Sequence, residues 1–575
     1  MRVQLGSLLL LIVASWCVGL FARVYWTPDE PREAALAATM HLQLDRSVPL
    51  LNGKPFAEKP PLTYWLAAAS IDSFGSSPAA ARLPQLLYAL LSLAAVFALG
   101  RAAAGRATGT TAALVFATSL LVYQTQIWLA CDALLIAGSC IALFGAFRGL
   151  WANNTAQRLL GYLIMHAGLT LAFFAKNFAA WLVPVSCWLA FVIWERRWRE
   201  LWRWELWLGG VLPAVCIAAW VYWVAQRVDS AAVLRVFFWN NLLGRVVSVA
   251  AAPELQYTSG HRNWPGKYLV ELLLYLVPWT TLAWFAARRS WKNVREPSAT
   301  RAAWRFAVCA SVPSLVILSL AATARNVYAA PSLAGIALLI ALWLNDSPES
   351  MRRAHVRGLT LSAWLIMIMA ALCLVTTLLL GWAAATATDP VIVFFSMAAC
   401  VICIVWCWRE RQQIAAASAH ESLNSLLGAY SLLLSAGILS AVLAINRWQD
   451  LRPVAEQMRE AIGTHAYALL NTDETTQAWA SLYLPAAPID TVGASQANRS
   501  ALMAFFDKYP DARVLALLPR AKWNRRDWLA YLSGNPQPQQ ARAAAQSDEW
   551  SQQWGLQVES FAERPGGRSY VLLSR

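Results

Sequence analysis

Charged side chains are scarce in this sequence. Only 14% of its 575 residues are Asp, Glu, Lys or Arg, whereas 58% are hydrophobic. The mean hydropathy is +0.44. A soluble fold of this size could not bury so much apolar surface, so the scarcity of charge excludes that class and indicates an integral membrane protein.

Acidic residues are scarcer than basic ones, which gives a formal charge of +15. The Lys and Arg residues fall in short clusters between apolar runs and do not follow one polar face. We therefore interpret the excess as a membrane-topology signal, and we expect no nucleic acid partner.

A disulfide framework is also missing. All ten cysteines lie within or at the ends of apolar runs, and none follows residue 446. Cys400, Cys403 and Cys407 share one helix face, but no His or carboxylate lies near them inside the membrane. Packing is the interpretation we favour, because free cysteine is commonly buried.

Long apolar runs predict about thirteen transmembrane helices. We interpret the N-terminal run as a retained first span, because no convincing cleavage site follows it. The predicted spans are 5–25, 83–100, 107–126, 131–150, 158–175, 178–194, 206–226, 268–287, 303–321, 326–344, 358–382, 390–408 and 424–445.

Alternate connections between these spans are strongly basic, as at 196–203 and 288–305. The positive-inside rule places the basic connections and the N-terminus in the cytoplasm. An odd number of spans then puts the loops 26–82 and 229–267, and everything after residue 445, outside. We expect a core at 1–345, additional membrane helices at 346–445 and a periplasmic domain at 446–575.

The last 130 residues or so change in character. Val454, Met458 and Ile462 follow a helical period, and short strand-like runs occur at 466–470, 514–518 and 570–573. The pattern predicts a small α/β domain. It contains no G-x-G-x-x-G motif, no metal-ligand spacing and no candidate triad, so its role is not apparent from sequence. The predicted fold class is mainly α and polytopic, with this α/β domain at the end.

Ionisable residues gather in the first outer loop. Residues 27–33 read Thr-Pro-Asp-Glu-Pro-Arg-Glu, and a helical stretch is expected from Ala34 to Leu44. An Asn52-Gly53 turn follows. Glu58 and Lys59 come directly before two prolines, which favour an extended segment.

Two more charges stand where spans meet the outer face: Asp132 opens the fourth span, and Lys176 lies in the tight turn between the fifth and sixth. Charges at membrane depth are costly and usually functional. The structural alternative is an ion pair, or side chains that reach out to water. Together with Asp29, Glu30 and Lys59 on the same face, the two residues favour a functional site.

Carboxylates beside lysines suit a reaction on a lipid phosphate. Ammonium groups can hold the anion while a carboxylate positions or deprotonates the attacking group. Further basic candidates in the outer loops are Arg245, His261, Arg262, Lys267 and Arg325.

The order and spacing of these residues resemble a known family. The motifs are Asp29-Glu30-x-Arg32, Leu51-Asn52-Gly53, Glu58-Lys59-Pro60-Pro61-Leu62 with Tyr64-Trp65, Phe74-Gly75 and Ala81-Arg82-Leu83-Pro84. They resemble the polytopic GT-C glycosyltransferases that use polyprenyl-phosphate sugars, particularly the lipid A aminoarabinose transferases (ArnT) and the protein O-mannosyltransferases. A weaker similarity continues through Asp132, Lys176, Pro278-Trp279 and the stretch Arg325 to Pro331.

The resemblance implies inverting transfer of one sugar from a polyprenyl (undecaprenyl) phosphate at the outer face of a bacterial inner membrane. Lipid A phosphate is the first expected acceptor, and an aminosugar such as aminoarabinose the expected sugar. Asp29 would be the main catalytic carboxylate, with Asp132 and Glu30 as further acidic residues. Lys59 would bind the donor phosphate. The other substrate-binding residues would be Arg32, Glu58, Lys176, Lys267 and Tyr328.

No catalytic metal is expected, because the leaving group of a monophosphate donor needs less charge stabilisation by a metal than that of a nucleotide diphosphate donor. Glu58 and His261 are candidate ligands of a structural divalent cation. The sequence departs from the family pattern at Glu33, where relatives often have Tyr, at Ala57, and at Asn177-Phe178. These positions line the expected pocket, so sugar and acceptor stay open.

Two alternatives remain from the sequence. One is transfer to protein Ser or Thr hydroxyls, which would require Asp29 to act as a base. The other is a lipid or sugar transporter. Transporters usually show repeated halves and charges near the membrane midplane, whereas here no matched repeats occur and the charges gather at the outer mouth.

Overall fold

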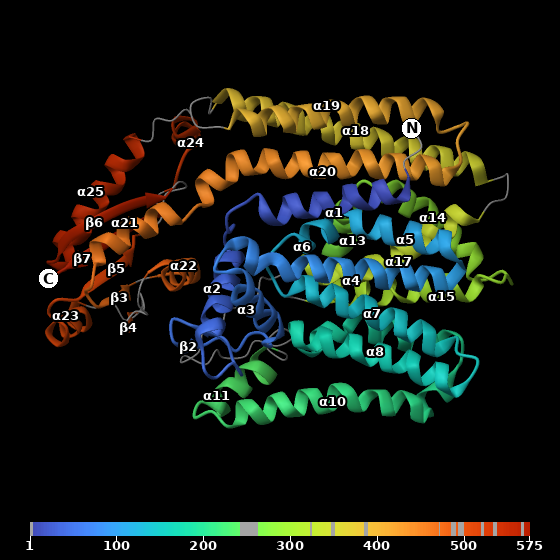
Figure 1. The fold of residues 1–575 in the computed structure, drawn as a ribbon, viewed down its shortest axis with the longest axis horizontal. Helices are drawn as coiled ribbons and strands as arrows, with labels where there is room; N and C mark the ends of the chain where they lie inside the picture. The colour runs from blue at the N-terminus through green and yellow to red at the C-terminus, as the bar shows by residue number, and fades with distance from the viewer. Residues whose placement is uncertain are drawn as a thin grey trace.

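The computed structural model describes residues 4–241, 263–321, 325–346, 351–383, 389–470, 472–484, 490–492, 499–518, 522–532, 537–564 and 568–575. A bundle of long helices forms one part of the molecule, and a small sheet with its own helices forms the other (Figure 1). The predicted fold class, a polytopic helical protein with a C-terminal α/β domain, is confirmed.

Each predicted span has a helical counterpart. In the described residues, nine helical segments are long and apolar enough to cross a membrane. They are α4 (Pro78–Ala104), α7 (Asp132–Leu150), α8 (Thr155–Lys176), α10 (Trp204–Ala225), α15 with α16 (Arg301–Cys309, Val312–Leu320), η4 with α17 (Asn326–Ser332, Leu333–Asn345), α18 (Arg352–Ala383), α19 (Pro390–Gln413) and α20 (Ala419–Gln449).

The remaining predicted spans are shorter or interrupted. They correspond to α1 (Leu5–Phe21), α5 with α6 (Arg106–Thr118, Leu120–Gln126), η1 with α9 (Phe178–Trp181, Leu182–Trp194) and α13 with α14 (Lys267–Tyr275, Thr280–Asn293). Pro278, which has no backbone N–H to donate, lies in the last of these breaks. The amide of Leu120 donates to the carbonyl of Val277 at 3.1 Å, so the two breaks satisfy each other's backbone groups.

Glycines bring α7 and α8 into close contact. A Cβ added at Gly145 would lie 2.1 Å from the backbone of Met165, and one at Gly168 would lie 2.4 Å from that of Ala142. Small residues allow membrane helices to approach this closely. Because α7 and α8 are antiparallel neighbours, the first residue of α7, Asp132, meets the last residue of α8, Lys176.

The first outer loop forms a compact unit at one end of the bundle. It contains α2 (Asp29–Leu42), the hairpin of β1 (Leu50–Leu51) and β2 (Lys54–Pro55), and α3 (Leu62–Phe74). The predicted Asn52-Gly53 turn is present, with φ of 51° and 76° at its two residues, a conformation that glycine adopts readily. The predicted helix begins earlier than Ala34, because α2 starts at Asp29; two acids in its first turn suit the positive end of the helix.

The second outer loop follows α10 and is described only at its ends; the first end holds α11 (Ser230–Leu234) and η3 (Arg235–Asn240), and the other leads into α13. The short helix η2 (Trp198–Trp202) lies in the basic connection between α9 and α10. Arg245, His261 and Arg262 lie outside the described residues. The structure therefore places Lys267, in α13, but not the other three basic candidates of this loop.

The C-terminal domain is a five-stranded mixed sheet with the order β4-β3-β5-β7-β6. β3 pairs in parallel with β4 and β5, and β7 pairs antiparallel with β5 and β6. Its elements are α21 (Arg452–Ile462), β3 (Tyr467–Leu470), α22 (Glu474–Tyr483), β4 (Asp490–Val492), α23 (Arg499–Lys508), β5 (Arg513–Leu517), α24 (Arg525–Leu532), α25 (Gln537–Trp554), β6 (Gln557–Arg564) and β7 (Arg568–Ser574).

Alternating side chains give this sheet two buried faces. Tyr467 and Leu469 pack with Met458 of α21 and Trp479 of α22, whereas Ala468 and Leu470, on the other face, pack with residues of α23. The predicted helix at 454–462 and the strands near 466–470, 514–518 and 570–573 are confirmed. β4 and β6 were not predicted from the sequence.

The sheet domain and the first outer loop lie at the same end of the bundle (Figure 1). α20 runs from the bundle to the domain, and α22 packs against α2. The amide of Asn52, in the hairpin turn, donates to the carbonyl of Gln477 in α22 at 3.0 Å. Residues far apart in the sequence therefore surround the start of α2.

Candidate active site

A cavity of about 630 Å³ opens beside the first residue of α2. Its wall contains two carboxylates, Asp29 and Asp132, and two cations, Lys267 and Arg325. The rest of the wall mixes apolar and polar side chains, as a site for an amphipathic ligand requires. The lining residues are Pro28, Asp29, Leu120, Leu121, Gln124, Thr125, Trp128, Ala130, Asp132, Asn263, Lys267, Leu274, Tyr275, Arg325, Asn326 and Val327.

Asp29 lies between two guanidinium groups. Its Oδ1 is 3.0 Å from Nη2 of Arg32, one helical turn later, and its Oδ2 is 3.4 Å from Nη1 of Arg325. Burial opposes ionisation of this carboxyl, but Arg32, Arg325 and Lys59 together lower its pKa below the usual value. Asp29 is therefore ionised at neutral pH, at the cavity wall.

Glu33 connects Lys59 to Arg32. Its Oε1 is 2.5 Å from the Lys59 ammonium and 2.7 Å from Nη2 of Arg32, and the Tyr64 hydroxyl donates to its Oε2 at 2.9 Å. Cations and carboxylates thus alternate from Lys59 through Glu33 and Arg32 to Asp29. The predicted phosphate ligand Lys59 is engaged by a carboxylate in this structure.

Asp132 and Lys176 form the ion pair that was the structural alternative from sequence. The Lys176 ammonium also lies 4.4 Å from the centre of the Tyr328 ring, a cation–π distance. Asp132 lines the same cavity as Asp29, so the ion pair borders that cavity. These contacts bring three predicted site residues together.

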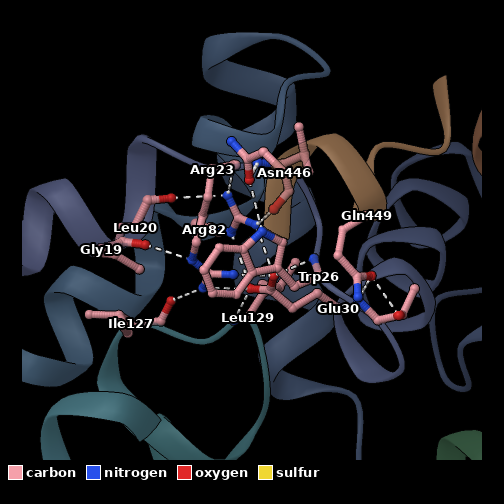
Figure 2. Close-up of polar contacts among 12 residues, drawn as sticks. Gly19, Leu20, Arg23, Trp26, Glu30, Arg82, Ile127, Leu129, Asn446 and Gln449 are labelled. Atoms are coloured by element: carbon pink, nitrogen blue, oxygen red, sulfur yellow. Dashed lines mark hydrogen bonds and ion pairs between the residues drawn. The ribbon is translucent and has the colours of Figure 1, made fainter. Parts of the chain in front are cut away.

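Glu30, the neighbour of Asp29, has a different environment (Figure 2). Its side chain is fully buried and binds Arg23 at 2.5 Å and Arg82 at 2.9 Å. The backbone amides of Trp26 and Leu129 also donate to it, each at 2.9 Å. Because every direction around this carboxylate is occupied by a donor, its surroundings favour a structural role, and a catalytic role for Glu30 stays an untested prediction.

The other predicted residues lie around this centre. Lys267 is at the cavity wall, where its ammonium is 3.2 Å from Oδ1 of Asn263. Glu58 is partly buried, and its carbonyl accepts a hydrogen bond from the Asn241 side chain at 3.1 Å. Among the described residues no group of three metal-ligating side chains occurs. The Glu58 and His261 cation site stays a prediction, because His261 is not described.

Glu33 should make the fold sensitive to acid. Burial opposes its ionisation, yet Lys59 and Arg32 lower its pKa from 4.5 to about 2. A carboxyl whose pKa is lower in the folded state contributes stability that is complete above the unfolded pKa and is lost as the pH falls towards the folded one. We expect the melting temperature of the detergent-solubilised protein to fall between about pH 4.5 and about pH 2, and Glu33→Gln to flatten that dependence.

A suitable control is Asp507→Asn, which breaks an exposed ion pair with Arg575 in the sheet domain. It should keep the pH dependence of the wild type. An unchanged dependence in Glu33→Gln would contradict the assignment to Glu33.

Comparison with known proteins bears on this arrangement. Residues 58–223 match the model of the family described as dolichyl-phosphate-mannose-protein mannosyltransferase. The chain is also 29% identical over 343 residues to an undecaprenyl phosphate-alpha-4-amino-4-deoxy-L-arabinose arabinosyl transferase of Pseudomonas aeruginosa, and 28% identical over 358 residues to that of Edwardsiella ictaluri. The first alignment spans 59% of this chain and 59% of the relative.

Solved structures extend the similarity to the whole chain. ArnT from Cupriavidus metallidurans bound to undecaprenyl phosphate superimposes with a TM-score of 0.73 at 18% identity, covering 98% of this chain and 97% of that one. Its apo form gives a TM-score of 0.72 at 16% identity, with coverage of 99% and 98%. The chain has the GT-C fold of ArnT. The resemblance inferred from the motifs is thereby confirmed, and the fold similarity includes the C-terminal domain.

Some residues of this candidate site were missed from sequence. Glu33 appeared only as a departure from the family pattern, and Arg82 only as part of a motif. Arg23 sits at the end of the first apolar run and resembles an ordinary flanking charge. Glu474 contacts Arg32 across 442 residues of sequence, which no local pattern could reveal.

Proposed function

We propose that this protein is an inverting glycosyltransferase that moves one sugar from a polyprenyl phosphate to a phosphate of lipid A. The observation that carries the proposal is the cavity wall, where Asp29 and Asp132 lie with Lys267 and Arg325. The names of the curated relatives favour undecaprenyl phosphate as the lipid carrier and 4-amino-4-deoxy-L-arabinose as the sugar.

In the proposed reaction a phosphate oxygen of lipid A attacks the anomeric carbon of the donor sugar. The bond between that carbon and the donor phosphate oxygen breaks, and polyprenyl phosphate leaves with the electron pair. Positive charge that develops on the sugar ring would be stabilised by Asp29 and Asp132. The leaving phosphate would be held by cations, for which Arg325 and Lys267 face the cavity. No metal is required for these steps.

The environment of Asp29 supports a phosphate acceptor over a hydroxyl. A Ser or Thr hydroxyl must lose a proton, and a carboxylate is a weak base when its pKa is lowered. Arg32 and Arg325 contact Asp29 directly and help to keep its pKa low. An ionised phosphate already carries the attacking negative charge, so it requires orientation only.

The same-end arrangement supports the proposed topology. The basic connections, such as those between α9 and α10 and between α14 and α15, lie at one end of the bundle. The elements α2 and α3 and the sheet domain lie at the other end (Figure 1). We propose that this end faces the periplasm, that the N-terminus is cytoplasmic, and that the protein resides in a bacterial inner membrane. In that arrangement the cavity beside Asp29 would lie at the periplasmic end of the bundle.

Mass spectrometry of lipid A tests the proposal. Cells lacking this chain should lose a sugar-sized mass increment on lipid A, and expression of the wild-type chain should restore it. An empty-vector control shows that restoration comes from the chain. Lipid A that is identical in all three strains would contradict the proposed acceptor.

Transfer to protein is the second candidate function, because the family model matched at residues 58–223 is that of a protein mannosyltransferase. Membranes from the same strains would then lack glycopeptides modified at Ser or Thr. Loss of such glycopeptides with unchanged lipid A would favour this candidate.

A further inference from the structure

The C-terminal third of the chain contacts the segment around Asp29 at two places. Glu474, the first residue of α22, binds Arg32 in α2 at 2.8 Å. Asn446 and Gln449, in the last turn of α20, bind the residues that lead into α2. Neither contact could be recognised in the sequence, because its partners are 420 or more residues apart.

The first contact acts through a shared guanidinium. Arg32 is almost completely buried, and its Nη2 binds both Asp29 and Glu33 while its Nη1 binds Glu474 at 2.8 Å. A guanidinium is planar, so fixing one amino group fixes the direction of the other. Glu33 holds Nε and Nη2 from one side and Glu474 holds Nη1 from the other, so Glu474 helps to set how Arg32 faces Asp29, although Glu474 does not line the cavity itself.

The second contact holds the non-helical link between α1 and α2 (Figure 2). The backbone amide and the hydroxyl of Thr27 both donate to Oε1 of Gln449, at 2.8 and 2.6 Å. The Trp26 indole donates to Oδ1 of Asn446 at 2.8 Å. A link without its own helix or strand hydrogen bonds depends on such side chains for a fixed path.

We propose that the C-terminal third positions the carboxylate of Asp29, with Glu474 orienting the Arg32 guanidinium and Asn446 and Gln449 fixing the link before α2. This inference rests on the proposed function. It gives the sheet domain a defined part in the reaction: the catalytic carboxylate reaches its working position only when α22 is docked on α2.

The expected effect of losing Glu474 is on rate, not on binding. Groups that react must be held within a fraction of an ångström of the productive geometry, and a misplacement of about 1 Å can reduce rate by about a hundredfold. In Glu474→Gln the Arg32 guanidinium faces a neutral amide on one side and is drawn towards Asp29 and Glu33. The side chain of Glu474 is 31% exposed, so the amide is accommodated without leaving a buried charge unpaired.

The test uses the full-length purified chain with Glu474→Gln, and Asp507→Asn as the matched control. Asp507 also forms an exposed ion pair in the sheet domain, with Arg575, and it has no contact with α2. The test would measure two quantities. One is the rate of sugar transfer to lipid A, with donor supplied in a membrane extract; the other is the shift in melting temperature produced by undecaprenyl phosphate. Glu474→Gln should lower the maximal transfer rate at least about tenfold, with half-saturating undecaprenyl phosphate within about twofold of the wild type. Asp507→Asn should match the wild type in both.

A double-mutant cycle separates positioning from general stability. If Glu474 acts through Arg32, then Glu474→Gln should cause little further loss of rate in an Arg32→Lys background, because lysine cannot bridge two carboxylates in a fixed plane. The proposal would be overturned if the fold-loss of rate in the double variant equalled the product of the fold-losses in the two single variants. A transfer rate within about twofold of the wild type for Glu474→Gln would overturn it as well. The cycle decides the matter even where the single variant lowers the melting temperature.

Asp29→Asn in the same assay distinguishes this inference from the proposed function. Transfer that survives in Asp29→Asn would refute the catalytic role of Asp29, and the positioning role would fail with it. Transfer that is lost in Asp29→Asn but kept in Glu474→Gln would refute the positioning role alone.

Discussion

Replacing Asp29 by Asn is expected to reduce sugar transfer by about 10²- to 10³-fold, the range found when one preorganised electrostatic contact to a developing charge is removed. Asn keeps the shape of the side chain but removes the negative charge that faces the donor sugar. The fold should tolerate the change, because Arg32 keeps Glu33 and Glu474 as partners. Arg325, the other partner of Asp29, is partly exposed and can be hydrated.

The measurement is the amount of modified lipid A per amount of chain in the membrane. Asp72→Asn serves as the control, since Asp72 is an exposed carboxylate at the same end of the molecule, paired with His41 and Arg46. It should leave both quantities unchanged. A fall in abundance that matches the fall in transfer in Asp29→Asn would point to a folding role and contradict catalysis.

The membrane bundle was predictable because the bilayer imposes a simple rule on sequence. A span must be apolar for about twenty residues, and all thirteen predicted runs coincide with helices in the structure. The breaks within α5–α6 and α13–α14 were not predicted. The two breaks meet in a hydrogen bond between Leu120 and Val277, which are distant in sequence, so no local pattern marks them.

The candidate site was predictable in its composition but not in its geometry. Asp29, Asp132 and Lys267 were singled out and do share one cavity wall. Lys59 was expected to bind the donor phosphate and Lys176 to help bind the substrate, yet each already has a carboxylate partner, Glu33 and Asp132. A bound phosphate would therefore have to share these lysines with the protein's own carboxylates. A sequence motif does not predict such competing ion pairs, because their partners come from other segments.

Helix geometry explains why the two adjacent acids have different environments. Successive residues of an α-helix point about 100° apart, so Asp29 and Glu30 cannot face the same partner. Asp29 faces the cavity, whereas Glu30 faces the interior between α1, α4 and the link before α7, where Arg23 and Arg82 meet it (Figure 2). The motif alone assigned catalysis to both residues, because a one-dimensional pattern does not state where a helix begins.

We accordingly expect substitution of Glu30 to impair folding, whereas substitution of Asp29 should impair sugar transfer. Burial opposes ionisation of this carboxyl, but Arg82 and Arg23 lower its pKa, so it is charged in the folded protein. In Glu30→Gln two buried guanidinium groups lose their shared counter-charge. Breaking a buried ion pair from one side typically costs about 3–5 kcal/mol, so we expect little folded protein in the membrane.

The readouts are abundance in the membrane and melting temperature after solubilisation, with transfer expressed per folded molecule. Asp29→Asn is the matched control, because it changes the neighbouring acid to its amide in the same turn of α2. We expect Glu30→Gln to be depleted while the molecules that do fold still transfer sugar. Normal abundance together with abolished transfer in Glu30→Gln would instead place this carboxylate in the reaction. The buried cluster of Arg23, Glu30 and Arg82 would then serve catalysis and contribute little to the stability of the fold.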